Sequence, residues 1–331
     1  MKKAFLRINR ITVLFAIFLI LSCGFSPVEQ NEPAFFQAGY LAWTPDARNI
    51  LQINQSAILR YPIPQLNPLV RFETNQENQI IIGFCAINQT AAVIEDEQKI
   101  VFYDAANAET IRSIPIPFHA YGGSCSPDGS SVLIYSADEI SASIWDSQNG
   151  ELRKTLSGFS TAAPVYNVTF SPDNAAILWH ARASFQLQKI EDGQLWKRID
   201  LWDFVDVYAL SPDSKILTTA ISTEDTMQNA VIFWNTESGE EISRIILQDQ
   251  PAQAITFQPD HQRVLIADDS NLYTVNLTDF KISSKESFPL SNDTDTNQAE
   301  RIQQISFSPD GIYLGVLTNQ GKVSLIQFDT K

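Results

Sequence analysis

The sequence predicts an all-β protein, a seven-bladed β-propeller of four-stranded antiparallel blades that covers residues 39–331. Two observations carry this prediction: a short Pro-Asp turn motif recurs every 40 to 50 residues, and segments rich in β-branched and aromatic residues flank it. A period in the low to middle forties is typical of propeller blades, in which each repeat folds into one four-stranded sheet. One repeat domain therefore replaces the two domains that a length of 331 residues would otherwise suggest.

The repeated motif is an apolar or aromatic residue, then a polar residue, Pro, Asp and a turn residue. Complete copies begin at Trp43, Cys125, Phe170, Leu210, Phe257 and Phe307, and a degenerate copy begins at Cys85. Proline presets the backbone of the first central turn position, Asp accepts hydrogen bonds from nearby amides, and Gly or Asn tolerates a positive φ. The motif therefore predicts a tight hairpin at one point in every blade.

The segments around the motif have the composition of strands. Residues 166–170 enter one turn and residues 176–179 leave it, and both are rich in β-branched or aromatic residues. Further along two repeats, Trp145-Asp146 and Trp234-Asn235 end strand-like segments. The pair Asn149-Gly150 that follows the first of them is a strong signal for a two-residue hairpin.

These motifs resemble those of WD-repeat propellers, over about residues 39–331. The Pro-Asp turns are similar to the family's inner-strand turn, and Trp145-Asp146 is similar to its third-strand ending. The Gly-His opening of the family's repeat is absent, and Trp145-Asp146 is the one true Trp-Asp pair. The resemblance implies a ring of blades, a form that commonly binds proteins or peptides.

Ring closure predicts a role for the N-terminal segment. The chain ends at Lys331, two residues after the last third-strand motif at Asp329, so the seventh blade would lack its outermost strand. An open edge of this kind invites aggregation. We expect residues near Phe35-Phe36 to cap that edge or to start the first blade.

The first 22 residues are predicted to be a lipoprotein signal peptide. A basic stretch over residues 1–10 precedes an apolar core over residues 11–21, which is too short for a comfortable membrane span. Residues 20–23, Ile-Leu-Ser-Cys, resemble a bacterial lipobox, which implies cleavage before Cys23 and lipidation of its side chain. Residues 23–38 would then be a lipidated tether. An uncleaved anchor or an ordinary signal peptide is the alternative.

This segment predicts a location in the cell envelope. Two or three acyl chains would hold the protein stably on the periplasmic face of an outer membrane or the outer face of a cytoplasmic membrane. The net charge of −15 repels phosphate backbones, so nucleic acid is excluded as an expected partner. One explanation of this negative charge is that an acidic surface keeps an exported protein soluble. The alternative is that the surface binds a basic partner or cations. We expect a monomer that touches the membrane only through its lipid.

Cys85 and Cys125 occupy the same repeat position in neighbouring blades. One blade of separation is expected to exceed the Cα distance of about 7 Å that a disulfide spans. Both cysteines are therefore predicted to be buried thiols that behave as small apolar residues, with a bridge between them as the alternative.

Catalysis and metal binding find little support in the sequence, and we expect no catalytic residue, no cofactor and no metal. The three histidines are scattered, and no Gly-x-Ser-x-Gly elbow is present. His261 is predicted to be a turn residue, His180 a packed core residue, and His119 a loop residue with the only plausible functional position. The acidic loop over residues 291–300 is predicted to be solvated, and cation binding is the alternative.

The loops that precede the inner strands gather on the face opposite the Pro-Asp turns. They carry six aromatic residues that we predict to bind a partner: Phe118, Tyr121, Tyr166, Trp202, Phe204 and Tyr208. Aromatic anchors dominate protein-binding hot spots, although packing between blades is the alternative for each ring.

The sequence thus predicts a non-catalytic, lipid-anchored scaffold for a protein or peptide. The alternative is a propeller that binds or hydrolyses a small molecule or glycan in its central channel. Paired acids near the axis, one with a perturbed pKa, would favour that alternative, whereas an apolar, open rim would favour the scaffold.

Overall fold

The computed structural model describes residues 10–12 and most of residues 40–328. Within the second range the residues not described are 45, 54–56, 68–69, 74–78, 86–89, 105–108, 137–139, 159–164, 182–183, 202–204, 206, 224–227, 249 and 291–298. The described part contains strands, turns and no helix, so no helix in it could cross a membrane.

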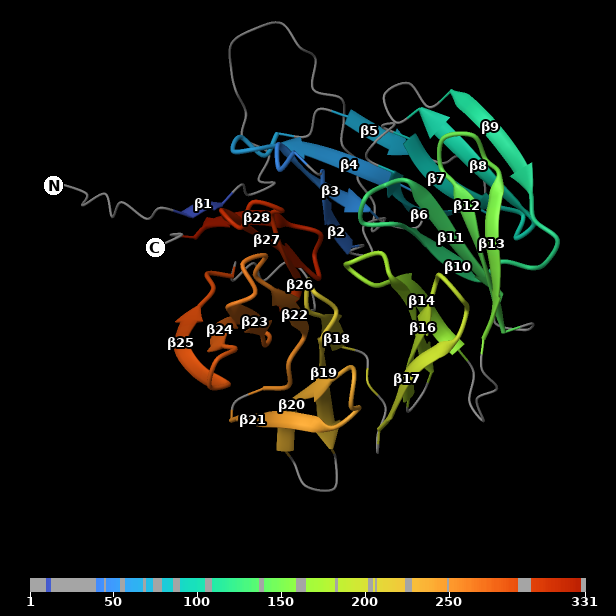
Figure 1. Cartoon of the computed structure of the whole chain (residues 1–331). Helices are drawn as coiled ribbons and strands as arrows, with labels where there is room; N and C mark the ends of the chain where they lie inside the picture. The colour runs from blue at the N-terminus through green and yellow to red at the C-terminus, as the bar shows by residue number, and fades with distance from the viewer. Residues whose placement is uncertain are drawn as a thin grey trace, which may run out of the picture.

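The described residues form seven four-stranded antiparallel sheets arranged as a β-propeller, which confirms the predicted fold (Figure 1). The first three blades consist of β2 (Tyr40–Trp43), β3 (Asn49–Ile53), β4 (Ala57–Pro62) and β5 (Val70–Glu73); β6 (Gln79–Cys85), β7 (Thr90–Glu95), β8 (Lys99–Asp104) and β9 (Thr110–Pro115); and β10 (Gly122–Cys125), β11 (Ser131–Ser136), β12 (Ser141–Asp146) and β13 (Leu152–Ser157).

The remaining four blades follow the same order. They consist of β14 (Val165–Phe170), β15 (Ala176–Ala181), β16 (Ser184–Lys189) and β17 (Leu195–Asp200); β18 (Val207–Leu210), β19 (Ile216–Thr223), β20 (Gln228–Asn235) and β21 (Glu241–Leu247); β22 (Ala254–Phe257), β23 (Arg263–Ala267), β24 (Asn271–Asn276) and β25 (Lys281–Ser287); and β26 (Ile302–Phe307), β27 (Tyr313–Thr318), β28 (Val323–Gln327) and β1 (Arg10–Thr12).

The apolar core is divided among the contacts between blades. Among the described residues there are seven buried apolar clusters, and each joins residues of two neighbouring blades. Between the fourth and fifth blades, for example, Phe185 and Leu217 are both almost fully buried. A sheet that is apolar on both faces needs a partner on each side, and a closed ring provides two partners for every blade.

The Pro-Asp motif forms the predicted hairpin between the first two strands of a blade. In the third blade the Ser126 hydroxyl donates to Asp128 Oδ1 at 2.6 Å, and the backbone N–H of Ser131 donates to the Ser126 hydroxyl at 2.9 Å. Asp128 also accepts from the Ser130 amide at 3.0 Å. Gly129 then has a φ of +71°, a left-handed conformation that glycine adopts without strain.

The same hydrogen bonds recur around the ring. The serine or threonine hydroxyl donates to the aspartate at Thr44–Asp46, Ser171–Asp173, Ser211–Asp213 and Ser308–Asp310. In the sixth blade Gln258 replaces the serine, yet Asp260 still accepts from the Gln262 amide at 2.9 Å. His261 has a φ of +61°, which confirms it as a turn residue. The degenerate copy at residues 86–89 lies outside the described residues.

The N-terminal segment supplies the outermost strand of the seventh blade, as ring closure predicted. Arg10–Thr12 pairs antiparallel with β28. Phe35 and Phe36, which were expected to cap this edge or to start the first blade, lie outside the described residues.

Hydrogen bonds near the axis complete the closure between the seventh and first blades. The Gln304 side chain accepts from the backbone N–H of Leu41 at 2.6 Å and donates to its carbonyl at 3.4 Å. The Trp43 indole N–H donates to the Ser306 carbonyl at 3.1 Å. Side-chain contacts therefore fasten the inner strands of these two blades, independently of the outer strand.

Removing the hydroxyl that organises a Pro-Asp turn should destabilise the ring. Ser126→Ala leaves the buried Ser131 amide without its acceptor, and we expect a loss of about 1–3 kcal/mol in the free energy of unfolding, measured in urea. Ser130→Ala in the same turn removes an exposed bond to Asp128 and two long contacts to Ser131 and Arg153, and it serves as the control, with a change within about 0.5 kcal/mol. Equal losses in both variants would contradict this account of the turn.

Candidate functional site

The starting ends of the inner strands lie together on one face of the ring, because every inner strand runs toward its own Pro-Asp turn. Four tyrosines occupy these ends: Tyr40 in β2, Tyr121 just before β10, Tyr166 in β14 and Tyr208 in β18. We call this surface the tyrosine face. The relative exposures of Tyr121 and Tyr166 are 51% and 45%, whereas Tyr208 is half-buried.

The other predicted aromatic residues have different surroundings. Trp202 and Phe204 lie outside the described residues. Phe118 is buried in the cluster between the second and third blades and therefore does not stand on the surface. Burial alternates along its segment: Ile116, Phe118 and Ala120 are buried, whereas His119 and Tyr121 are exposed. The period of two was visible in the sequence and could have separated Phe118 from Tyr121.

Tyr40 was missed in the sequence, although it precedes Pro45 much as Tyr121 precedes Pro127. Its ring is 39% exposed, and its hydroxyl donates to the Ile82 carbonyl in the second blade at 3.3 Å. Burial of that hydroxyl among the inner strands raises the pKa of Tyr40, which keeps the phenol protonated. The ring therefore lies at the axis as a neutral group held between two blades.

Further hydrogen bonds tie neighbouring blades together on this face. The Tyr135 hydroxyl donates to the Tyr166 carbonyl at 3.0 Å, which links the third and fourth blades. The Asn167 amide donates to the Tyr208 hydroxyl at 3.2 Å, which links the fourth and fifth. The tyrosine face is thus fixed in shape by contacts that cross from blade to blade.

His180 is packed beneath the tyrosine face, as predicted for a core residue. It is 5% exposed, stacks on Phe185 with ring centroids 4.6 Å apart, and meets the edge of Tyr208 at 4.9 Å. Burial lowers the pKa of His180 to about 4, against a smaller raising effect of a hydrogen bond to the Val205 backbone. The imidazole is therefore neutral at physiological pH and supports the aromatic cluster as an uncharged ring.

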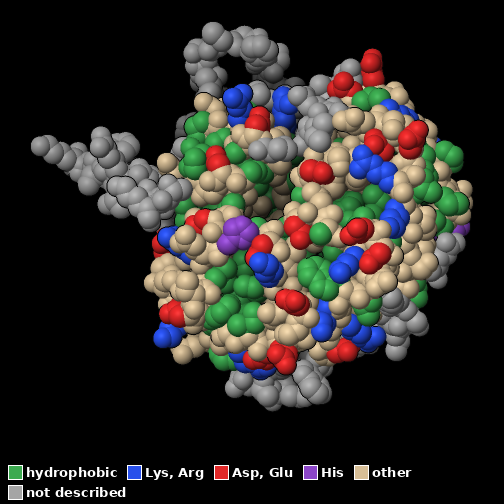
Figure 2. Space-filling view, viewed as in Figure 1, with side chains coloured by type: hydrophobic (Ala, Val, Ile, Leu, Met, Phe, Trp, Pro, Cys, Tyr) green, Lys and Arg blue, Asp and Glu red, His purple; other side chains and the backbone are tan. Residues whose placement is uncertain are grey.

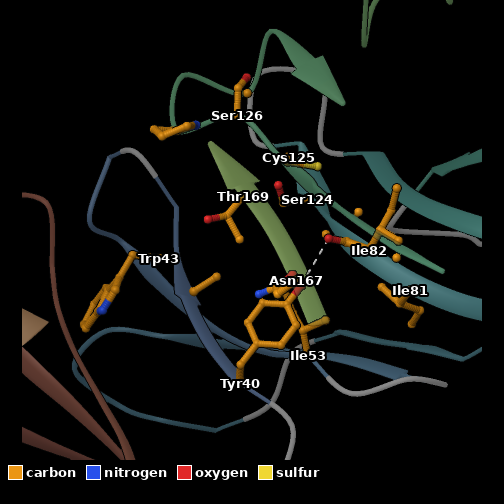
Figure 3. A pocket seen from close by; sticks show the side chains of 16 residues that line it. Tyr40, Trp43, Ile53, Ile81, Ile82, Ser124, Cys125, Ser126, Asn167 and Thr169 are labelled. Carbon is orange, nitrogen blue, oxygen red and sulfur yellow. Dashed lines mark hydrogen bonds between the residues drawn. The ribbon is translucent and has the colours of Figure 1, made fainter. Parts of the chain in front are cut away.

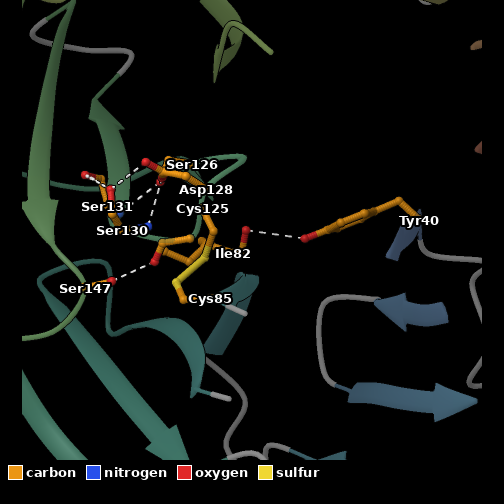
Figure 4. Close-up of a disulfide and its surroundings, with 10 residues drawn as sticks. Tyr40, Ile82, Cys85, Cys125, Ser126, Asp128, Ser130, Ser131 and Ser147 are labelled. Atoms are coloured by element: carbon orange, nitrogen blue, oxygen red, sulfur yellow. Dashed lines mark hydrogen bonds between the residues drawn. A yellow bond between two sulfur atoms is a disulfide. The ribbon is translucent and has the colours of Figure 1, made fainter. Parts of the chain in front are cut away.

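Cys85 and Cys125 form a disulfide, so the prediction of two separate thiols is wrong (Figure 4). Their Cα atoms are 5.7 Å apart, well within the range for a bridge. Inner strands of neighbouring blades converge toward the axis, so equivalent residues there lie closer than the width of a blade suggests. Gly83 permits this approach, because a Cβ at that position would lie 2.9 Å from Cys125 Sγ.

A cavity of about 580 Å³ lies in the central channel, bounded by the inner strands of the first four blades (Figure 3). Its described lining contains isoleucines, glycines, serines and Thr169, together with Tyr40 and Asn167, and no Asp, Glu, Lys, Arg or His. The paired acids that would have favoured a hydrolytic channel are therefore not among these lining residues. The cavity offers uncharged polar groups and the aromatic rings of Tyr40 and Trp43.

Charged side chains lie elsewhere on the molecule. Figure 2 shows acidic and basic residues scattered over several blades on the face seen in Figure 1, without one dominant patch. His119 is exposed and lies 3.4 Å from Glu97, on the rim of the second blade. The part of the chain that the structure describes holds no group of three His, Cys, Asp or Glu side chains able to bind a metal. The acidic loop lies largely outside that part, at residues 291–298.

No protein-family model and no curated protein sequence matches this chain. What the structure shows is a seven-bladed β-propeller fold. Because propellers support many unrelated functions, a function must be argued from the tyrosine face and the channel cavity themselves.

The buried imidazole should make stability depend on pH. The folded His180 has a pKa of about 4, below the 6.5 of the free side chain, so the unfolded chain takes up a proton first as the pH falls. The contribution of neutral His180 to the free energy of unfolding is fully present above pH 6.5. It is lost as the pH falls from 6.5 to 4. We expect a loss of roughly 2–3 kcal/mol over that window.

The variant His180→Phe tests this dependence by urea unfolding at about pH 7 and about pH 4.5. It should lose less stability than the wild type between the two conditions. His119→Gln removes an exposed imidazole and should keep the wild-type profile. A pH profile for His180→Phe that is identical to that of the wild type would show that this imidazole does not resist protonation.

Proposed function

We propose that this protein is a non-catalytic scaffold of the cell envelope, anchored by lipid at Cys23, that binds a protein partner on the tyrosine face. The observation that carries the proposal is the exposure of Tyr121 and Tyr166 at equivalent ends of neighbouring blades. Single exposed apolar residues are common, but tyrosines that share a rigid surface match the anchors of protein interfaces. The Tyr166 carbonyl accepts from Tyr135 of the third blade, and the Tyr121 amide donates to the Tyr135 carbonyl within its own blade. Little ordering is therefore needed on this side when a partner binds.

The interface proposed here is centred on the third and fourth blades. Tyr208 lies in the adjoining fifth blade with its ring against His180 and extends the aromatic surface. Trp202 and Phe204 belong to the segment just before β18, and we keep them as proposed members of the interface. A partner with basic groups would also be attracted by the net charge of −15.

The disulfide supports the proposed location. Disulfides form and persist in oxidising compartments, such as the periplasm and the cell surface, and are rare where thiols are kept reduced. Within this bridge Cys85 is fully buried, with a relative exposure of 0%. This support is independent of the signal-peptide pattern in residues 1–22.

Cleavage before Cys23 would have a structural consequence. It removes β1 (Arg10–Thr12), which is the outer strand of the seventh blade. The edge of β28 would then need another strand, and we propose that the tether at residues 23–38 supplies it.

The anchor is tested by mass spectrometry of the mature N-terminus. We expect an acylated Cys23 as the first residue, and Cys23→Ala should remain unprocessed and lose its lipid. An unmodified Cys23, or a mature chain that keeps residues 1–22, would overturn the lipoprotein proposal while leaving the tyrosine face untouched.

The partner site is tested by photocrosslinking in intact envelopes and by affinity capture. A photoreactive residue at position 121 or 166 should capture a discrete protein, and Tyr121→Ser/Tyr166→Ser should reduce its recovery at least tenfold, since each hot-spot side chain contributes about 1–2 kcal/mol or more. The control Ile111→Ser/Ile282→Ser replaces residues of similar exposure on the outer strands β9 and β25. Equal recovery with both double variants would exclude this face as the interface.

A further inference from the structure

We propose that the channel cavity binds a short neutral saccharide. This inference concerns the axis of the ring and is independent of the tyrosine-face interface. The cavity of about 580 Å³ falls in the range of roughly 300–1,000 Å³ that small-ligand sites occupy, and a mono- or disaccharide fits within it.

The chemistry of the lining selects for a neutral ligand. The chain carries a net charge of −15, yet none of the described residues that line the cavity is charged. A carboxylate, phosphate or ammonium group bound there would lose its hydration without gaining a counterion, which is costly. Hydroxyl groups suffer no such penalty if partners for hydrogen bonding are present.

Such partners lie on the neighbouring inner strands β10 and β14 (Figure 3). Ser124 in β10 lines the cavity, but its hydroxyl oxygen is enclosed in the wall and would reach a ligand only after a change of rotamer. Asn167 uses one amide hydrogen on Tyr208, which leaves its carbonyl oxygen as an acceptor toward the channel. Thr169, two residues further along β14, adds another hydroxyl. Hydroxyls and amides both donate and accept, which is what polyhydroxylated rings require.

An apolar surface completes the site. The Tyr40 ring borders the cavity, and its hydroxyl is already committed to the Ile82 carbonyl, so its position is fixed. Ile53 and Ile81 add aliphatic wall on the first and second blades. A saccharide has one apolar face of C–H groups and a polar periphery, and this pairing of ring and hydroxyls fits it better than it fits a wholly apolar ligand.

The covalent link between β6 and β10 keeps the wall in place. Cys125 lines the cavity and is bonded to Cys85 in the neighbouring blade. Gly122 and Gly123 line it with backbone, because a Cβ at either position would come within 3 Å of Tyr135 or Leu133. The site is therefore largely preformed, which lowers the ordering cost of binding.

The test is isothermal titration of the full chain with glucose, N-acetylglucosamine and maltose, with glucuronate and glucosamine as charged pyranose counterparts. At about 10 mM ligand, even a Kd of about 1 mM gives clear binding. We expect at least one neutral sugar to bind and the charged pyranoses to bind at least tenfold more weakly. Absence of binding by all three neutral sugars, or equal binding of the charged ones, would overturn the proposal.

Two variants locate the site. Thr169→Val removes a hydroxyl while keeping the side-chain shape and should weaken binding roughly fivefold, the effect of one typical hydrogen bond. Tyr40→Leu removes the ring and should weaken binding at least tenfold. Thr256→Val is the matched control, because Thr256 holds the same repeat position in the sixth blade, away from the first four blades, and should leave affinity unchanged.

Unfolding curves of all three variants establish whether each remains folded. A folded Thr169→Val with wild-type affinity, or a loss of affinity in Thr256→Val equal to that in Thr169→Val, would exclude the cavity as the binding site. Neither result bears on the protein partner, which is tested at Tyr121 and Tyr166.

Discussion

The structure depends on apolar contact between neighbouring blades. Each sheet buries both faces, and each of the seven apolar clusters draws on two blades, so no blade has a core of its own. Stability is consequently a property of the closed ring. The polar Pro-Asp turns add little burial, but they set the register between the first two strands of each blade. This explains why the turn motif is the most regular feature of a sequence whose apolar residues vary freely.

Local chemistry made the fold predictable, whereas the site depends on distances across blades. The Ser126–Asp128 turn is encoded within a few residues, so its spacing alone indicated blades. The disulfide was missed because the convergence of inner strands at the axis is set by the whole ring. Tyr40 and Asn167 face the same cavity although more than a hundred residues separate them, and nothing local to either shows this. Phe118 was different, since its alternation was readable.

The two proposed sites place different demands on the same scaffold. A protein interface needs exposed rings on a firm surface, and Tyr166 meets this need at the rim. A saccharide site needs enclosed, uncharged hydrogen-bonding groups, and Thr169 in the same strand lies deeper along the axis. Tyr166 stands at a β-bulge near the start of β14, whereas Thr169 lies near the end of that strand, so one short strand contributes to the rim and to the channel.

The single disulfide makes the ring mechanically uneven. The second and third blades are joined by a covalent bond at the axis, whereas the seventh and first are joined by the Gln304 and Trp43 hydrogen bonds and by packing. When the ring opens under heat or force, it must open between two neighbouring blades that the disulfide does not join. The second and third blades then stay tethered to each other, whereas the cavity, which draws its wall from four blades, loses its shape as soon as the first or the fourth blade moves away.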